Sequence, residues 1–146
     1  MEAIVLETRF LVDLERERAA AARRTRQHST EHVAQPATAF LTRLPDVRLY
    51  VTITTAGELA SGVRNGDRDR WDALIKPYAL IGIDADVCWE YSRAFRYLSD
   101  NGMLIGANDL WIAAAAISRG LPLATRNARH FGRVPRLQVV DYSAPE

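Results

Sequence analysis

Short apolar runs alternate with stretches of helical periodicity along this chain. The apolar runs predict buried strands at residues 3–6, 49–52, 80–83, 121–125 and 137–141, and the run at 49–52 is β-branched and aromatic as strands often are. Helical spacing of apolar residues predicts six helices, at 10–26, from 29 or 30 to about 44, and at 56–63, 70–79, 85–102 and 109–119. Strands that alternate with helices form parallel sheets, so the pattern predicts an α/β fold.

Capping residues and helix breakers mark several of the predicted boundaries. Ser29 or Thr30 is expected to cap the second helix, and Asp84 the fifth. Gly120 ends the sixth helix. Because no repeat, low-complexity tract or linker interrupts this order, residues 1–146 are expected to form a single domain.

The composition is that of an ordinary globular domain. The chain has 146 residues, 48% hydrophobic and 25% charged, which is enough to bury a core and argues against general disorder. Its formal net charge of +1 does not by itself indicate a nucleic-acid partner. Cys88 is the only cysteine, and its place beside Trp89 in an apolar stretch predicts a buried thiol. Neither a signal peptide nor a membrane span is recognisable, so a cytoplasmic protein is expected.

Polar side chains follow several of the predicted strands at the points where these strands end. Glu7 comes directly after the first strand, Glu58 lies in the helix after the second, and Asn127 follows the fourth. Asp109 opens a helix whose apolar stripe is buried, so its side chain is expected at the mouth of the core. Each residue alone is compatible with an ordinary cap, turn or solvated helix position. Ligands of open α/β sheets, however, bind beyond the carboxyl ends of the strands, where all four residues are expected to meet.

Three carboxylates brought together repel one another unless protons or a cation neutralise them. Hard oxygen ligands select Mg²⁺ or Mn²⁺. Such an ion lowers the pKa of a bound water and stabilises negative charge that develops on a phosphate. Glu7, Glu58 and Asp109 therefore predict metal-assisted hydrolysis of a phosphodiester, with Asn127 beside them.

Four segments of the chain resemble the sequence blocks of one known family. They are residues 4–15 (IVLETRFLVDLE), 50–63 (YVTITTAGELASGV), 106–120 (GANDLWIAAAAISRG) and 123–131 (LATRNARHF), the last followed by 137–142. Together they resemble PIN-domain ribonucleases of the VapC toxin type, from one end of the chain to the other. The third and fourth blocks are the more specific ones.

This resemblance implies a fold, an activity and partners. The fold is a three-layer α/β/α sandwich with a mostly parallel central sheet. The activity is that of an Mg²⁺- or Mn²⁺-dependent endoribonuclease, the toxin of a toxin–antitoxin pair, which forms a homodimer and binds a cognate antitoxin. In the family pattern, Glu7, Glu58 and Asp109 match the metal-binding catalytic acids, and Asn127 matches the fourth catalytic position.

Two positions depart from the family pattern. The family has Asp where this chain has Glu7, whose carboxylate lies about one carbon–carbon bond further from the backbone. The fourth position is often Asp, whereas Asn127 offers a carbonyl oxygen without negative charge. The resulting set of three carboxylates and one amide is expected to bind metal more weakly than four acids.

Residues near the four polar positions have candidate supporting roles. Thr8 and Thr125 flank the acids and could hold metal-bound waters or simply satisfy backbone groups. Arg126, Arg129 and Arg133 belong to a basic C-terminal segment with few acids, and they are candidates for contacts with RNA phosphates.

Three further readings concern other chemistry, binding and assembly. His28, Glu31 and His32 match the H-x-x-E-H pattern of zinc peptidases, which needs both histidines on one helix. A PIN-like module whose altered acids no longer cleave, but which still binds RNA or an antitoxin, is the main alternative to the enzyme. A homodimer is expected from the resemblance and from the N-terminal helical region, which mixes the apolar residues Phe10, Leu11, Leu14 and Phe40 with charged faces.

Overall fold

Five parallel strands form the centre of the molecule. The computed structural model describes residues 1–144, apart from the side chain of Asn65, so the last two residues of the predicted domain lie outside the described part. The sheet has the order β3-β2-β1-β4-β5, and all four neighbouring pairs are parallel. The strands are β1 (Ala3–Leu6), β2 (Arg48–Thr52), β3 (Ala79–Ile81), β4 (Leu123–Thr125) and β5 (Val139–Asp141).

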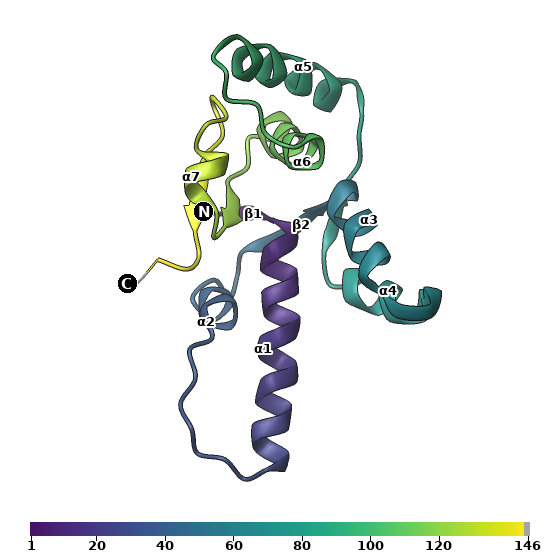
Figure 1. Ribbon diagram of the computed structural model, residues 1–146, viewed down its shortest axis with the longest axis vertical. Coiled ribbons are helices and arrows are strands. Elements are labelled where there is room, and N and C mark those ends of the chain that lie inside the picture. Colours follow the sequence, from purple (N-terminus) through teal and green to yellow (C-terminus); the bar gives the residue numbers. More distant parts are fainter. Residues whose placement is uncertain (145–146) are drawn as a thin grey trace.

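Helices cover both faces of this sheet (Figure 1), which confirms the predicted three-layer α/β/α sandwich. One apolar cluster joins the sheet to α5 and α6, and a second joins it to α1 and α2. A short 3₁₀ turn, Arg64–Gly66, connects α3 to α4. The α-helices are α1 (Thr8–Arg26), α2 (Pro36–Thr42), α3 (Ile53–Gly62), α4 (Arg68–Ile75), α5 (Ala85–Asp100), α6 (Ala107–Ser118) and α7 (Ala128–Phe131).

The central strand β1 shows how the sequence builds the two clusters. Successive side chains of a strand point to opposite faces. Ile4 and Leu6 belong to the cluster beneath α1 and α2, whereas Val5 belongs to the cluster beneath α5 and α6. All three side chains are fully buried, because β1 has a strand on each side and helices on both faces. This arrangement brings the end of β1 to the middle of the sheet edge.

The predicted second helix begins later than the sequence suggested. Ser29 and Thr30 lie in a segment without regular structure, and α2 starts at Pro36. Proline favours the first turn of a helix because its missing N–H has no partner there. The helix gains its capping acceptor from Glu17 of α1, which accepts hydrogen bonds from the N–H groups of Ala37 at 3.1 Å and Thr38 at 2.8 Å.

The zinc-peptidase reading is wrong because its residues do not share a helix. His28 follows the end of α1 and has a φ of 52°, which turns the chain out of the helix. Glu31 and His32 lie in the irregular segment before α2. The two histidines therefore cannot form the helical pair that the motif requires.

The expected burial of Cys88 is also wrong. The buried side chains of α5 include Val87, Ala94 and Leu98, which face the sheet. Cys88 is one residue, or about 100°, further round the helix than Val87, and its side chain is exposed. Within residues 1–144, no helix is long and apolar enough to cross a membrane.

Candidate active site

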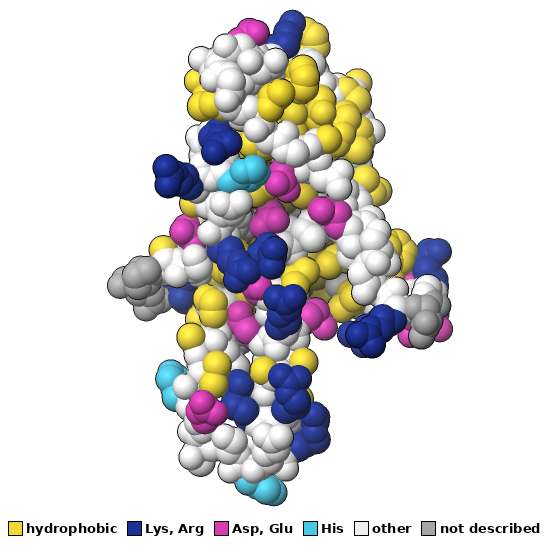
Figure 2. Space-filling view, in the orientation of Figure 1, with side chains coloured by type: hydrophobic (Ala, Val, Ile, Leu, Met, Phe, Trp, Pro, Cys, Tyr) yellow, Lys and Arg dark blue, Asp and Glu magenta, His cyan; other side chains and the backbone are white. Residues whose placement is uncertain are grey.

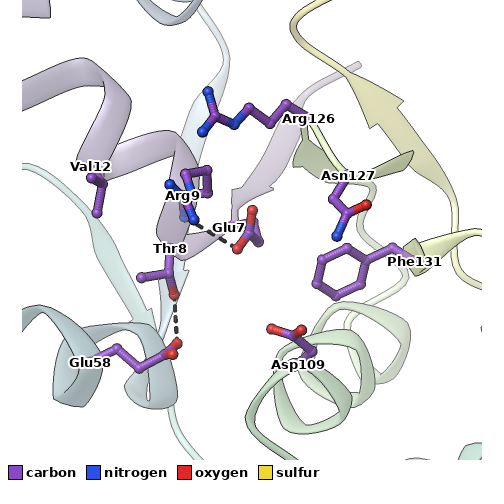
Figure 3. A pocket seen from close by; sticks show the side chains of 9 residues that line it. All are labelled: Glu7, Thr8, Arg9, Val12, Glu58, Asp109, Arg126, Asn127 and Phe131. Atoms are coloured by element: carbon purple, nitrogen blue, oxygen red, sulfur yellow. Dashed lines mark hydrogen bonds between the residues drawn. The ribbon is translucent and has the colours of Figure 1, made fainter. Parts of the chain in front are cut away.

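A pocket at the carboxyl edge of the sheet gathers most of the predicted polar residues. Its volume is about 610 Å³. In Figure 3, Glu7 lies between Glu58 and Asp109 on one side and Arg126 on the other. The lining residues are Glu7, Thr8, Arg9, Val12, Glu58, Asp109, Arg126, Asn127 and Phe131.

Glu7 is a nearly buried carboxylate between β1 and α1. It is the N-cap of α1, and its side chain accepts a hydrogen bond from the N–H of Arg9 at 3.2 Å. The hydroxyl of Thr125, at the end of β4, donates to its other oxygen at 3.2 Å. Burial raises the pKa of Glu7, and the charges of Asp109 and Glu58 raise it further. Glu7 is therefore held in place by two donors but is electrostatically strained when ionised.

Threonine hydroxyls fix Glu58 at the pocket wall. Thr8, in the first turn of α1, donates a hydrogen bond to Glu58 Oε1 at 2.7 Å. The Thr8 and Thr55 hydroxyl oxygens are 2.9 Å apart. Thr52, the N-cap of α3, in turn accepts from the N–H of Thr55 at 3.1 Å. This chain of hydroxyls connects the start of α1 to the start of α3 and sets the direction of the Glu58 side chain.

Asp109 enters the pocket from the first turn of α6 and contacts a histidine. Its Oδ2 lies 3.0 Å from His130 Nε2, which comes from α7. The Asp109 side chain is 35% exposed, so it lies at the mouth of the core as predicted but keeps contact with solvent. The contact with His130 could not be predicted, because sequence spacing alone does not show that α7 packs beside the start of α6.

Asn127 lies at the pocket with its side chain exposed. It follows β4 directly and is the N-cap of α7, without a hydrogen bond from its side chain to that helix. Its backbone N–H donates to the Thr125 hydroxyl at 3.0 Å. Thr125 thus links Asn127 to Glu7, and the Asn127 amide is left to face the pocket (Figure 3).

The sequence did not predict an ion pair beside the pocket between a buried acid, Asp13, and an exposed arginine, Arg126. Asp13 is only 7% exposed and accepts a hydrogen bond from the Tyr142 hydroxyl at 2.6 Å. The same Asp13 oxygen lies 3.2 Å from Arg126 Nη1. Burial, followed by the bond to Asp13, raises the pKa of Tyr142 well above its usual value. Asp13 and Tyr142 therefore hold Arg126 at the rim of the pocket. Because Asp13 and Tyr142 are 129 residues apart in the sequence, no local pattern predicts their contact.

Comparison with known proteins identifies the family. The sequence model of the PIN domain matches residues 4–137, which include every residue that lines the pocket. The chain belongs to the PIN-domain family. Among its relatives, Ribonuclease VapC1 of Methanocaldococcus jannaschii is 33% identical over 85 residues, which span 58% of this chain and 62% of that protein. Ribonuclease VapC1 of Haemophilus influenzae strain R2866 is 31% identical over 105 residues, which span 68% of this chain and 78% of that protein.

Solved structures agree with the PIN-domain fold over nearly the whole chain. VapBC-1 from nontypeable Haemophilus influenzae superposes with a TM-score of 0.72 at 25% identity and covers 97% of this chain and 99% of that one. VapBC2 from Rickettsia felis, solved bound to a DNA fragment from its promoter, gives a TM-score of 0.71 at 22% identity, with 94% and 97% covered. The predicted resemblance to VapC-type PIN domains is thereby confirmed.

The predicted basic residues of this PIN domain do not all reach the pocket. Arg126 lines it, whereas Arg129 and Arg133 are exposed and are absent from its lining. Arg9 lines the pocket instead. Its place in the first turn of α1, directly after the carboxyl end of β1, is the signal that could have revealed it.

The acids of the PIN-domain pocket surround it without converging on one point. Among residues 1–144, no three His, Cys, Asp or Glu side chains lie close enough together to hold a metal ion between them. The three carboxylates nevertheless interact electrostatically. Burial raises the pKa of Glu7, and the charges of Asp109 and Glu58 raise it further. The pocket thus has carboxylates around an open volume, and they do not form a compact, preformed metal site.

Proposed function

We propose that this chain is a metal-dependent endoribonuclease and the toxin of a toxin–antitoxin pair. The observation that carries the proposal is the set of three carboxylates, Glu7, Glu58 and Asp109, that face one pocket at the carboxyl edge of the sheet. Relatives that bear the name Ribonuclease VapC support RNA as the substrate. A neighbour described as a toxin–antitoxin complex from Klebsiella pneumoniae supports an antitoxin as the partner.

The donor set suits Mg²⁺ or Mn²⁺. All the candidate donors are oxygens. Burial is the main cause of the raised pKa of Glu7, and the repulsion from Asp109 and Glu58 that raises it further is the kind that a divalent cation relieves. Mg²⁺ keeps several of its waters and binds through one or two carboxylates, which fits acids that surround a pocket without forming a cage. When bound, such an ion supplies a water of lowered pKa and neutralises charge on the phosphate that is attacked.

The chain's own residues prepare the pocket for a phosphodiester. Asp109 and Glu7 would hold the cation, and the Thr8 hydroxyl keeps Glu58 aimed at the pocket. The Asn127 amide orients a water or the ribose, since it carries both a donor and an acceptor. Across the pocket, the Arg126 guanidinium offers its planar fork to a phosphate oxygen.

Cleavage assays with matched variants test this proposal. The protein is incubated with total RNA in Mg²⁺, in Mn²⁺ and in a chelator. Asp109→Asn keeps the shape and removes the charge, so it is expected to lower cleavage at least about a hundredfold, as losing a charge that stabilises a transition state does. Asp100→Asn, at the exposed end of α5, is the control and leaves cleavage unchanged. Cleavage that persists in Asp109→Asn, or in the chelator, contradicts the proposal.

A module that binds RNA or an antitoxin without cleaving is the second candidate. It is favoured by the two departures from the family pattern, Glu7 for Asp and Asn127 for Asp. Glu7→Asp draws the carboxylate back toward β1, and we expect cleavage equal to or above that of the unaltered chain. If neither form cleaves RNA while both still bind it, the second candidate replaces the enzyme.

A further inference from the structure

One exposed face of α1 carries arginines at a regular interval. Arg9, Arg16 and Arg23 follow one another at seven-residue spacing, and all three are exposed. Seven residues make nearly two helical turns, so the three side chains lie in one row. From Arg9 to Arg23 this row extends about 21 Å along the helix axis. Ala20, a small residue between the last two, leaves the row open to close approach.

The acids of α1 do not neutralise this row because they have other partners. Asp13 binds Tyr142 and Arg126. Glu15 lies 3.7 Å from Arg18, and Glu17 accepts from the first N–H groups of α2. In the part of the chain that the structure describes, Arg9, Arg16 and Arg23 are absent from every ion pair.

The row is continuous with the pocket. Its first member, Arg9, lines the pocket together with Arg126. Figure 2 shows Lys and Arg side chains over the visible side of α1, from the level of the pocket to the far end of the helix. A polyanion that is bound in the pocket and extends along α1 toward its C-terminal end therefore lies next to positively charged side chains.

We propose that an RNA strand bound in the pocket continues along α1, with its phosphates on Arg9, Arg16 and Arg23. This inference rests on the proposed nuclease function and adds a second contact region to it. A guanidinium matches a phosphate with two parallel hydrogen bonds, and a sugar–phosphate backbone presents such groups at regular intervals. An acidic peptide has to place its carboxylates at matching intervals to use the same row. Because phosphate contacts carry no sequence information, the row strengthens binding without selecting a base sequence.

A pair of double variants with identical charge change tests the inference. Arg16→Gln with Arg23→Gln removes two members of the row. Arg18→Gln with Arg26→Gln removes two exposed arginines from the other sides of the same helix. Arg and Gln have similar helix propensities, so both variants are expected to melt at the temperature of the unaltered chain. Binding of a labelled single-stranded oligoribonucleotide is measured in a chelator over a series of salt concentrations.

The salt dependence of binding gives the expected result. Each phosphate contact to a single strand contributes about 0.7 to the slope of log affinity against log salt, so the row variant should lose about 1.4. The control variant keeps the slope of the unaltered chain. In Mg²⁺, the row variant should lose kcat/KM on a long oligonucleotide but not on a trinucleotide, which fills only the pocket.

Other outcomes overturn the inference in distinguishable ways. If both double variants lose the same amount of slope, RNA binding depends on the total positive charge of α1 and not on the row. If the row variant keeps the salt slope of the unaltered chain and still cleaves RNA, the row does not bind RNA, but the proposed nuclease function is unaffected. If the row variant loses binding of a polyglutamate peptide and keeps that of RNA, the face recognises acidic protein segments. If the unaltered chain neither binds nor cleaves RNA, the proposed function fails and the row fails with it.

Discussion

Glu7 is the residue at which stability and the proposed chemistry conflict. Its pKa is raised from 4.5, chiefly by burial and then by Asp109 and Glu58. The folded chain therefore binds the Glu7 proton more tightly than the unfolded chain, so its stability falls as the pH rises from about 4.5 through the raised pKa. At neutral pH the ionised Glu7 costs stability in the absence of a cation. Active sites commonly keep such unfavourable groups for function.

The first prediction concerns Glu7→Gln. Because Gln keeps an acceptor for Arg9 but carries no charge, this variant should melt a few degrees above the unaltered chain at pH 7 in metal-free buffer. The difference should vanish below pH 4.5, where Glu7 is protonated in both states. Mg²⁺ should raise the melting temperature of the unaltered chain more than that of the variant.

Thermal melts of Glu2→Gln provide the matched control for that experiment. Glu2 is exposed, five residues earlier in the chain, so the same substitution should change nothing at either pH. A Glu7→Gln protein that melts below the unaltered chain at pH 7 contradicts the prediction. In that case the two hydrogen bonds to the Glu7 carboxylate outweigh its burial and repulsion.

At the scale of elements, α2 depends on a side chain from another helix. Its own N-cap, Gln35, makes no side-chain hydrogen bond to it. Glu17 of α1 supplies the missing acceptors. A carboxylate at a helix N-terminus also interacts favourably with the helix dipole. This contact fixes α2 against α1 across the irregular segment that joins them.

The second prediction is that Glu17→Ala loosens α2. The loss of a capping acceptor should lower the free energy of unfolding by about 0.5–2 kcal/mol. Hydrogen exchange should accelerate at the amides of Ala37 and Thr38, which lose their acceptor. Glu15→Ala is the control, because an exposed pair such as Glu15–Arg18 contributes about 0–1 kcal/mol. Equal effects of the two substitutions in chemical denaturation would show that Glu17 is not a cap.

The elements that the sequence predicted well are those with strong local patterns. The strand at 3–6 and the helix that ends near residue 26 agree with β1 and α1, because apolar runs and helical periodicity are local properties. The start of α2 was missed because its capping acceptor is Glu17, twenty residues away from Ala37. A local capping signal cannot reveal a partner in another helix.

The candidate site was likewise predictable only where its residues lie at positions that the local pattern fixes. Residues at strand ends, such as Glu7 and Asn127, could be placed from the parallel topology alone. Contacts between elements could not, and Asp13 with Tyr142 is the clearest example. A buried acid on a helix looks like any other helix acid until the tertiary structure brings its partner to it.

At the scale of the molecule, the apolar residues of the N-terminal helical region cannot form a dimer surface, because they are buried. The apolar residues that motivated the dimer are all at most 5% exposed and belong to the core; they are Phe10, Leu11, Leu14 and Phe40. They cannot contact a second copy without unfolding. Hydrophobic side chains instead gather at the surface where α5 and α6 lie (Figures 1 and 2).

The third prediction is a homodimer formed by the aromatic surface of these helices. Tyr91 stacks on Trp111 at 3.9 Å between ring centroids and on Phe95 at 6.3 Å, and Phe95 is 42% exposed. Light scattering should give twice the chain mass of 16.4 kDa. Phe95→Glu should yield a monomer, because it places a charge in an apolar interface. Trp89→Glu, 60% exposed on another side of α5, should leave the mass unchanged. A monomeric unaltered chain at high concentration contradicts this prediction.

The strand order also has a consequence for synthesis on the ribosome. β1 leaves the ribosome before the other four strands, but it lies at the centre of the sheet and pairs with β4, which comes more than a hundred residues later. Thr125, the donor to Glu7, and the pocket residues Arg126 and Asn127 come from the same late part of the chain. Such long-range pairing cannot form before both strands exist. A growing chain therefore has no complete pocket until β4 and the pocket residues that follow it have been translated.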